Sequence, residues 1–259
     1  MKTLIVHAHP EPKSLNGSLK DLAVSTLEDA GHEVRVSDLY AMGWKAVVDG
    51  ADYGSHASSP LKVAADSGRA FDAGTLTEDV RAEQEKLLWA DAVVLQFPLW
   101  WYTMPAILKG WVDRVFTHHF AYGVGEHSDT RYGERFGEGT LAGRRALLSV
   151  TVGGPRSHYA ARGINGPIDD LLFPIQHGVL YYPGLDVLPP FVVYGADRMT
   201  AEEYPAVAEA WTQRLLTLES AEPIPFRRQN FGDYEIPSLS LKEGREAAGR
   251  TGFGLHVRA

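Results

Sequence analysis

The sequence predicts an α/β fold in which a doubly wound parallel sheet carries helices on both faces. Several short segments are apolar and β-branched without alternation, which is typical of central strands in a parallel sheet. Segments with helical spacing separate these strands, so that strand and helix alternate along the chain. Loops rich in Pro, Gly or aromatic residues follow three of the strands directly. Because open parallel sheets bind ligands at the carboxyl ends of their strands, the same pattern predicts where a site should lie.

The first elements form a strand–helix–strand unit. Residues 3–8 (TLIVHA) predict a buried strand, and residues 9–18 (HPEPKSLNGS) predict a loop. Apolar residues recur at helical spacing over 15–27, and Gly31 ends that helix. Residues 33–37 (EVRVS) alternate, which favours an edge strand that is exposed on one side.

The middle of the chain departs from this alternation. Residues 49–74 are rich in Ser, Gly, Ala and Asp and show no periodicity, so we expect a long excursion from the core. Thr75 and Glu78 have capping-box spacing and predict the start of a helix that runs to Leu88. Residues 92–97 (AVVLQF) predict a second buried strand.

The second half of the chain returns to alternating strands and helices. Pro105 lies where a first helical turn tolerates proline, and an apolar face over 107–116 predicts the next helix. Residues 146–152 (ALLSVTV) predict a third buried strand, residues 187–193 a fourth, and residues 201–218 an amphipathic closing helix. We therefore expect one α/β domain over residues 1–222. Residues 223–259 mix Pro, Gly, aromatic and charged residues, which predicts an ordered, extended C-terminal tail lying on another part of the protein.

Composition and charge exclude several function classes. The chain carries 25 Lys and Arg against 33 Asp and Glu, a net charge of −8, which argues against nucleic acid as a partner. It has no Cys, so thiol nucleophiles and Cys-ligated metals are excluded, and any redox chemistry requires a bound cofactor. No apolar run is long enough to span a bilayer and no secretory signal is evident. We expect a cytoplasmic protein that is not embedded in a membrane.

The first candidate loop follows residues 3–8. Ser14 and Asn16 precede and open a helix, so they could form an anion site with its free N–H groups, although taken alone they are better explained by an ordinary N-cap. His7 and His9 lack a carboxylate at metal-ligand spacing. The adjacent pair His118-His119 is expected to point in different directions at a helix end. We therefore predict no metal site.

Two further loops carry unusual residues. Residues 98–105 (PLWWYTMP) place two Trp and a Tyr between prolines, where they could pack in a core, at an interface or against a flat ligand. Gly153 and Gly154 directly follow a predicted strand and permit close approach of a ligand to the backbone, although a tight turn would also explain them. Tyr159 follows in the same loop, close enough for its side chain to reach such a ligand.

Motifs along nearly the whole chain resemble the NAD(P)H:quinone oxidoreductases of the DT-diaphorase type. The segments that carry the resemblance are LIVHAHPEPKSLNGSL, VRVSDLYAMGW, AEQEKLLWADAVVLQFPLWWYTMPAILKGWVDRVF, FAY at 120–122, TVGGPRSHYAARGINGP, FPIQHGVLYYPG and FGLHV at 253–257. The resemblance implies a flavodoxin-like fold, bound FAD rather than FMN, NAD(P)H as co-substrate and a homodimer with active sites at the subunit interface. It also implies two-electron reduction of quinones by ping-pong hydride transfer. The tail would then pack on its own domain or on the dimer partner.

The resemblance also implies site residues. It places Tyr159 at the pyrimidine end of the flavin and Asn165 beside it, so these two are the expected catalytic residues. Trp101, Tyr122, Val124 and Tyr182 would form the pocket in which nicotinamide and quinone alternate. The implied cofactor-binding residues are His9, Leu15, Asn16, Pro98, Leu99, Trp100, Trp101, Tyr102, Thr151, Val152, Gly153, Gly154 and Tyr159.

Several positions depart from the family pattern. Trp100 stands where Gln is frequent and Val124 where a second aromatic is frequent, which changes the shape of the pocket. Asn165 stands where His is frequent, so a group that titrates near neutral pH is replaced by one that does not. A basic residue that contacts the adenosine half of the cofactor falls near Tyr204 and is not preserved.

Two other functions stay open beside the enzyme. Relatives of this fold act as flavoprotein regulators of potassium-efflux membrane proteins, which is the leading alternative. A one-electron carrier is disfavoured by the enclosed aromatic pocket and the long tail. The residues do not indicate whether NADH or NADPH is preferred, or which quinone is reduced.

Overall fold

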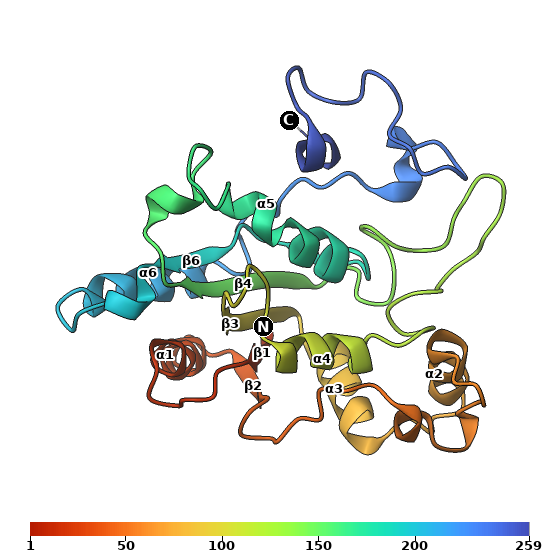
Figure 1. The fold of residues 1–259 in the computed structure, drawn as a ribbon, viewed down its shortest axis with the longest axis horizontal. Coiled ribbons are helices and arrows are strands. Elements are labelled where there is room, and N and C mark those ends of the chain that lie inside the picture. Colours follow the sequence, from red (N-terminus) through yellow and green to blue (C-terminus); the bar gives the residue numbers. More distant parts are fainter. Residues whose placement is uncertain (259) are drawn as a thin grey trace.

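The computed structural model describes residues 1–258 and contains a parallel sheet of six strands (Figure 1). Five strands follow the order β2-β1-β3-β4-β5, and β6 also pairs with β4. Each of these pairings is parallel, so the predicted doubly wound sheet is confirmed. The strands are β1 Lys2–His7, β2 Glu33–Asp38, β3 Ala92–Pro98, β4 Arg145–Val152, β5 Asp186–Val187 and β6 Phe191–Tyr194.

Helices cover both faces of the sheet because successive strand residues point to opposite sides. Ile5 of β1 packs with Leu19 and Trp211 under α1 and α6, whereas Leu4 faces the core under α3, α4 and α5 (Figure 1). The indole Nε1 of Trp211 donates a hydrogen bond to the Leu19 carbonyl at 3.0 Å, which ties α6 to α1. Among residues 1–258 no helix is long and apolar enough to cross a membrane. The helices are α1 Leu15–Asp29, α2 Val63–Asp72, α3 Glu78–Trp89, α4 Ala106–Val115, α5 Ile168–Phe173 and α6 Tyr204–Leu216.

The excursion over 49–74 is more regular than its sequence predicts. It contains a 3₁₀ helix at Gly50–His56 and the helix α2. The face that α2 buries consists of small and polar residues, so it leaves no apolar period to detect. Asp66 on that face is fully buried and accepts hydrogen bonds from the backbone N–H groups of Ser58 and Lys62 at 2.9 and 3.0 Å.

Two other local predictions are wrong. The capping box at Thr75 and Glu78 does not form, because α3 begins after Thr77, whose side chain makes no capping hydrogen bond. The single strand over 187–193 is divided into β5 and β6, since Pro189 and Pro190 have no N–H to donate to a ladder. The α5 helix and its π-helical continuation Pro174–Tyr181 were not anticipated, because a proline at their junction reads as a helix break.

A buried ion cluster fastens the excursion to the sheet helices. Arg114 of α4 is 3% exposed and binds Asp52 at 2.8 Å and Asp79 at 2.6 Å. Its guanidinium also lies 4.6 Å from the centre of the Trp44 ring and donates to the Lys45 carbonyl at 3.1 Å. The cluster thus fixes the 3₁₀ helix, α3 and α4 relative to one another.

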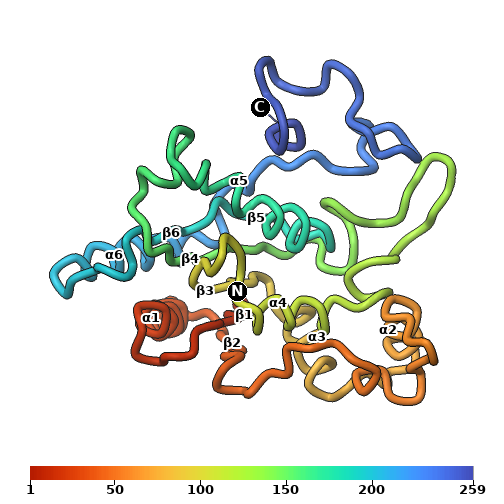
Figure 2. The backbone as a smooth tube through the Cα atoms, in the orientation of Figure 1, coloured from red at the N-terminus to blue at the C-terminus, as the bar shows by residue number. Residues whose placement is uncertain are grey.

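The C-terminal segment from residue 223 returns to the sheet and then folds back on itself (Figure 2). The Ile224 N–H donates to the Val187 carbonyl at 2.7 Å, beside β5. Further along, Phe226 bridges to Val257, and the ring of Phe253 stacks on Phe173 of α5 at 4.3 Å. A domain boundary at residue 222 stays a prediction.

Candidate functional site

Three loops meet at the carboxyl edge of the sheet because β1, β3 and β4 are neighbours there. The Leu99 N–H, just after Pro98 at the end of β3, donates to the Thr151 carbonyl at 2.8 Å. The Asn16 amide nitrogen donates to the Thr151 hydroxyl at 2.8 Å, and Gln96 donates to the Asn16 carbonyl at 2.6 Å. The first, second and third candidate loops are therefore fastened together at their roots.

The first loop packs tightly against the start of α1, whose first residue is Leu15. Ser14 is the N-cap, and its hydroxyl accepts from the Gly17 N–H at 3.1 Å. A Cβ on Gly17 would lie 1.9 Å from the Pro12 carbonyl oxygen, so only glycine fits there. His9 turns back on its own loop, where its Nδ1 lies 3.1 Å from the Glu11 N–H.

A group of buried polar side chains lies beneath these loops. His7, Asn16 and Gln96 are at most 3% exposed. In residues 1–258 each has one polar atom without a hydrogen-bond partner: His7 Nδ1, Asn16 Oδ1 and Gln96 Oε1. Burial lowers the pKa of His7 to about 4, so this imidazole is neutral at physiological pH. The unpaired amide oxygens of Asn16 and Gln96 are buried acceptors, and they favour a neighbour that donates hydrogen bonds, as hydroxyl groups of a ligand would.

The second loop presents aromatic side chains to solvent. Trp101 is 93% exposed, and Trp100 and Tyr102 are 41% and 51% exposed. Trp101 and Tyr102 have left-handed φ angles of 49° and 65°, which is strained for residues with a Cβ. Reciprocal backbone hydrogen bonds between Trp100 and Thr103, at 3.0 and 3.1 Å, hold this turn. The turn offers flat apolar faces for stacking.

The third loop begins where Val152 ends β4. A Cβ on Gly153 would lie 2.3 Å from a carboxylate oxygen of Asp197, and one on Gly154 would lie 3.1 Å from the Tyr159 ring. The two glycines therefore let Asp197 and Tyr159 lie directly on the backbone. Sequence reasoning missed Asp197, although it follows β6 at the same sheet edge and the carboxyl-end rule would have selected it.

The two expected catalytic residues lie together with Tyr102. The Tyr102 hydroxyl donates to Asn165 Oδ1 at 3.0 Å, and the Asn165 side chain acts on Tyr159 by lowering its pKa against the larger effect of burial. Burial, with a further contribution from Tyr102, raises the pKa of Tyr159 above its ordinary value. Tyr159 is therefore a protonated hydrogen-bond donor at physiological pH.

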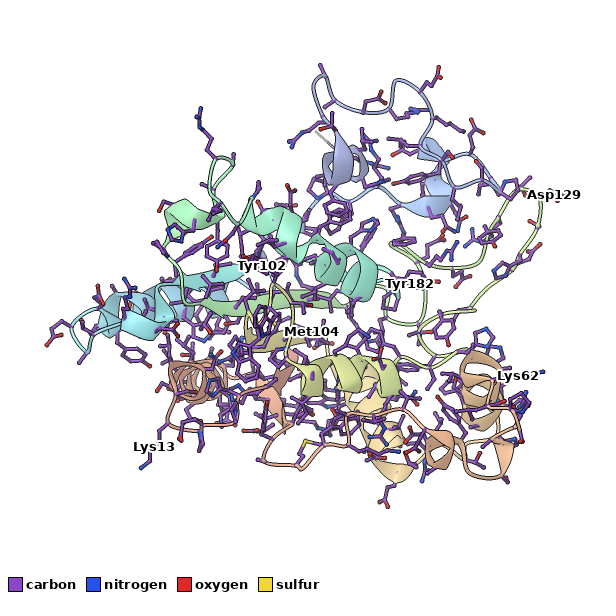
Figure 3. The ribbon with its side chains drawn as sticks, in the orientation of Figure 1. Lys13, Lys62, Tyr102, Met104, Asp129 and Tyr182 are labelled. Atoms are coloured by element: carbon purple, nitrogen blue, oxygen red, sulfur yellow. The ribbon has the colours of Figure 1, made fainter. Side chains whose placement is uncertain are left out.

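The expected substrate residues are divided between two places. Tyr122 and Tyr182 line one hollow of about 210 Å³, with Phe116 and Val179 among its walls. Trp101 and Val124 do not line it. Figure 3 shows Tyr102 and Tyr182 well apart, so the aromatic turn and this hollow are separate features of one chain.

The histidine pair after α4 differs from expectation. The rings of His118 and His119 lie against each other with centroids 4.1 Å apart, because His119 adopts a left-handed φ of 69°. His119 Nδ1 also lies 2.9 Å from Asp72 of α2. In the described part of the chain no group of three or more potential ligand side chains could hold a metal ion.

Comparisons with known proteins agree with the observed fold. A family profile described as a flavodoxin-like fold matches residues 1–215. The chain is 53% identical to a ribosyldihydronicotinamide dehydrogenase-like protein of Penicillium crustosum, covering 100% of this chain and 96% of that one. It is 36% identical to rat NAD(P)H dehydrogenase [quinone] 1, over 99% of this chain and 92% of that one.

Solved structures with a similar fold include flavin and quinone proteins by their names. A Klebsiella pneumoniae protein named as a candidate quinone reductase superposes with a TM-score of 0.96 at 57% identity, covering 99% of each chain. General stress protein 14 of Treponema denticola, solved in complex with FMN, superposes with a TM-score of 0.58 at 27% identity, over 85% of this chain and 100% of that one.

Proposed function

The chain belongs to the flavodoxin-like family that contains the NAD(P)H dehydrogenases of quinones, and we propose that it is an FAD-dependent NAD(P)H:quinone oxidoreductase. The observation that carries this proposal is the junction of three loops at one sheet edge. There the turn that carries the exposed rings of Trp100, Trp101 and Tyr102 is joined to the loop of Tyr159, a protonated donor, by the hydrogen bond from Tyr102 to Asn165. The relatives carry enzyme names, so the regulatory alternative is not favoured.

The residues present fit a flavin. The aromatic turn offers faces for a planar ring, and the unpaired Asn16 Oδ1 suits a hydroxyl-rich chain such as a ribityl group. Ser14 and the first turn of α1 suit a phosphate. Bound there, the flavin would supply the redox chemistry, accepting a hydride from NAD(P)H and passing two electrons to the quinone in ping-pong order. The proposed contacts are those of His9, Leu15, Asn16, residues 98–102, residues 151–154 and Tyr159.

The chain's own catalytic contribution is hydrogen bonding in a fixed geometry. Tyr159 keeps its proton and lies beside Gly154, at the edge where a stacked ring would end. A donor fixed in advance stabilises negative charge that develops on a neighbouring acceptor, without reorganisation during the reaction. Asn165 adds a second neutral group that keeps its state across physiological pH. These two residues are the proposed catalytic pair.

The proposal includes a homodimer. In one chain the hollow at Tyr122 and Tyr182 is separate from the aromatic turn, and Trp101 and Ile164 are 93% and 92% exposed. Large exposed aromatic and aliphatic side chains at the rim of a site are typical of interfaces. A second copy that brings its own hollow over the turn would complete a pocket of Trp101, Tyr122, Val124 and Tyr182.

The decisive experiment is analysis of the purified protein. We expect a yellow protein with about one FAD per chain, identified by the mass of the released cofactor, and NAD(P)H oxidation that depends on added quinone. Release of FMN alone would refute the FAD assignment. Absence of any flavin together with absence of quinone-dependent turnover would refute the function. Light scattering at low concentration tests the dimer, and an active monomer would refute the shared pocket.

A further inference from the structure

The hydroxyl of Tyr102 donates a hydrogen bond to the side-chain amide of Asn165, and that amide lowers the pKa of Tyr159. We propose that Tyr102 is a positioning residue that orients the Asn165 amide, so that its nitrogen faces Tyr159 and leaves the Tyr159 proton free for the bound ligand. The inference rests on the proposed function for the role of Tyr159. Its geometric part, the orientation of one amide, can be tested without any turnover.

The backbone of the aromatic turn explains how Tyr102 reaches Asn165. A left-handed φ of 65° at a residue with a Cβ is costly, on the order of 1–3 kcal/mol. Trp101 beside it carries a second such angle, and the Trp100–Thr103 hydrogen bonds hold both. This strained turn and the 3.0 Å bond between Tyr102 and Asn165, which are 63 residues apart in sequence, are independent observations. The φ angles define the course of the turn, and the hydrogen bond places the Tyr102 hydroxyl at Asn165.

The two ends of the Asn165 side-chain amide have different hydrogen-bonding roles. A side-chain amide has an accepting oxygen on one side and a donating nitrogen on the other. Asn165 Oδ1 accepts from Tyr102, and the Asn165 side chain lowers the pKa of Tyr159, which is the effect of a group that donates to the phenol oxygen. We therefore assign Nδ2, which can only donate, to the side of Tyr159. The Tyr159 oxygen therefore accepts, and its own proton remains available to another acceptor.

The opposite orientation would remove that donor. If the amide were rotated by half a turn, Asn165 Oδ1 would accept the Tyr159 proton, and Tyr159 would offer the ligand only an acceptor. The backbone of Asn165 does not prevent this rotation, because it is held only through its N–H, which donates to the His158 carbonyl at 3.0 Å. Among residues 1–258, the charged group that acts on Tyr159 is Asp197, which raises the pKa of the phenol. The ring centres of Tyr159 and Tyr194 lie 5.9 Å apart. Neither fixes the amide of Asn165.

The orientation is measurable because the chain has only three asparagines, Asn16, Asn165 and Asn230. Selective ¹⁵N labelling of asparagine gives three side-chain NH₂ groups, and Asn165→Ala assigns one of them. In the protein as purified at neutral pH, we expect Tyr102→Phe to speed hydrogen exchange of the Asn165 NH₂ about 10-fold, since a loss of about one neutral hydrogen bond frees the amide. The NH₂ groups of Asn16 and Asn230, bonded to Thr151 and Gly133, should not change.

Kinetics separate positioning from direct contact. We expect Tyr102→Phe to lower kcat with quinone about 10-fold and to leave KM and flavin affinity near wild type. In an Asn165→Ala background the same substitution should have no further effect on kcat, because its action passes through the amide. Tyr40→Phe, in the turn after the edge strand β2 and outside the three site loops, is the matched control and should change neither readout.

Two results would overturn the inference. Unchanged Asn165 NH₂ exchange in Tyr102→Phe would show that the hydroxyl does not hold the amide. An equal loss of kcat in the wild-type and Asn165→Ala backgrounds would show that Tyr102 acts on the ligand itself. If the wild-type protein shows no quinone turnover, the proposed function fails, and the exchange measurement still decides the orientation.

Discussion

Gly17→Ala tests whether the first loop is held in place by its packing on α1. In an open helix this substitution would stabilise the protein by about 1 kcal/mol. Here the new Cβ would lie 1.9 Å from the Pro12 carbonyl oxygen and 2.7 Å from its carbon, both backbone atoms. A normal carbon–oxygen contact is about 3.3 Å, so the Pro12 carbonyl must retreat by about 1.4 Å.

The retreat should disturb both stability and binding. It moves Pro12 away from the start of α1, disturbs the neighbouring Ser14 cap, whose bond to the Gly17 N–H is worth about 1 kcal/mol, and strains the close packing. We expect the free energy of unfolding to fall by about 1–3 kcal/mol despite the gain in helix propensity. We also expect weaker flavin binding, because Asn16 is displaced with the loop.

Denaturant titration measures the stability, and quenching of flavin fluorescence measures the binding. The matched control is Ser25→Ala on the exposed side of the same helix, which should change the stability by less than about 0.5 kcal/mol. A Gly17→Ala protein that is as stable as wild type, or more stable, and binds flavin equally well would refute the reasoning.

Four further predictions address chemistry and stability. Tyr159→Phe should slow flavin reduction by NAD(P)H by a barrier of about 2–4 kcal/mol while affecting flavin affinity less; equal losses in stopped-flow rate and in affinity would contradict this. The rate of flavin reduction should show no inflection near pH ~6.5 from position 165, and Asn165→His should introduce one; identical profiles would exclude this position from the hydride step. Burial lowers the folded-state pKa of His177 to about 4, so the unfolded chain binds this proton first and stability should fall as the pH drops from ~6.5 towards 4. His177→Phe should flatten that slope in denaturant midpoints measured across this range, and an unchanged slope would argue against it. Arg114→Met should cost about 3 kcal/mol because the buried Asp52 loses both guanidinium hydrogen bonds and keeps only its pair with Lys45, whereas Lys109→Met, which breaks only the exposed pair with Asp113, should cost less than about 1 kcal/mol; similar losses in the two unfolding curves would refute the buried-pair argument.

The sequence predicts those parts of the fold whose buried face is apolar and periodic. β1, β3 and β4 are buried on both faces, and their uninterrupted β-branched runs are recognisable without further information. The sequence does not predict α2, because its buried residues are polar or small and form no apolar pattern with helical spacing. These residues are Asp66, Ser67, Gly68 and Ala70.

The site is predictable as a location and less so as a set of contacts. The carboxyl-end rule selects all three loops, because it depends only on the order of strands. The bond from Tyr102 to Asn165 depends on left-handed angles at two residues that rarely adopt them, so no pattern in the sequence indicates it. The same rule would also select Asp197, which follows the end of β6. The sequence predicts one strand over 187–193 and so does not show where β6 begins and ends.

The two edges of the sheet determine how copies of this chain can associate. One edge consists of the two-residue β5 and the four-residue β6, which Pro189 and Pro190 separate without N–H groups, and the Ile224 N–H already occupies the Val187 carbonyl. At the other edge β2 carries the charged residues Glu33, Arg35 and Asp38. Short, proline-bounded or charged edges resist the addition of a foreign strand, which is the usual first step of β-aggregation. The fold can therefore leave bulky aromatic side chains in solvent and still favour association through loops and helices over growth of the sheet from chain to chain.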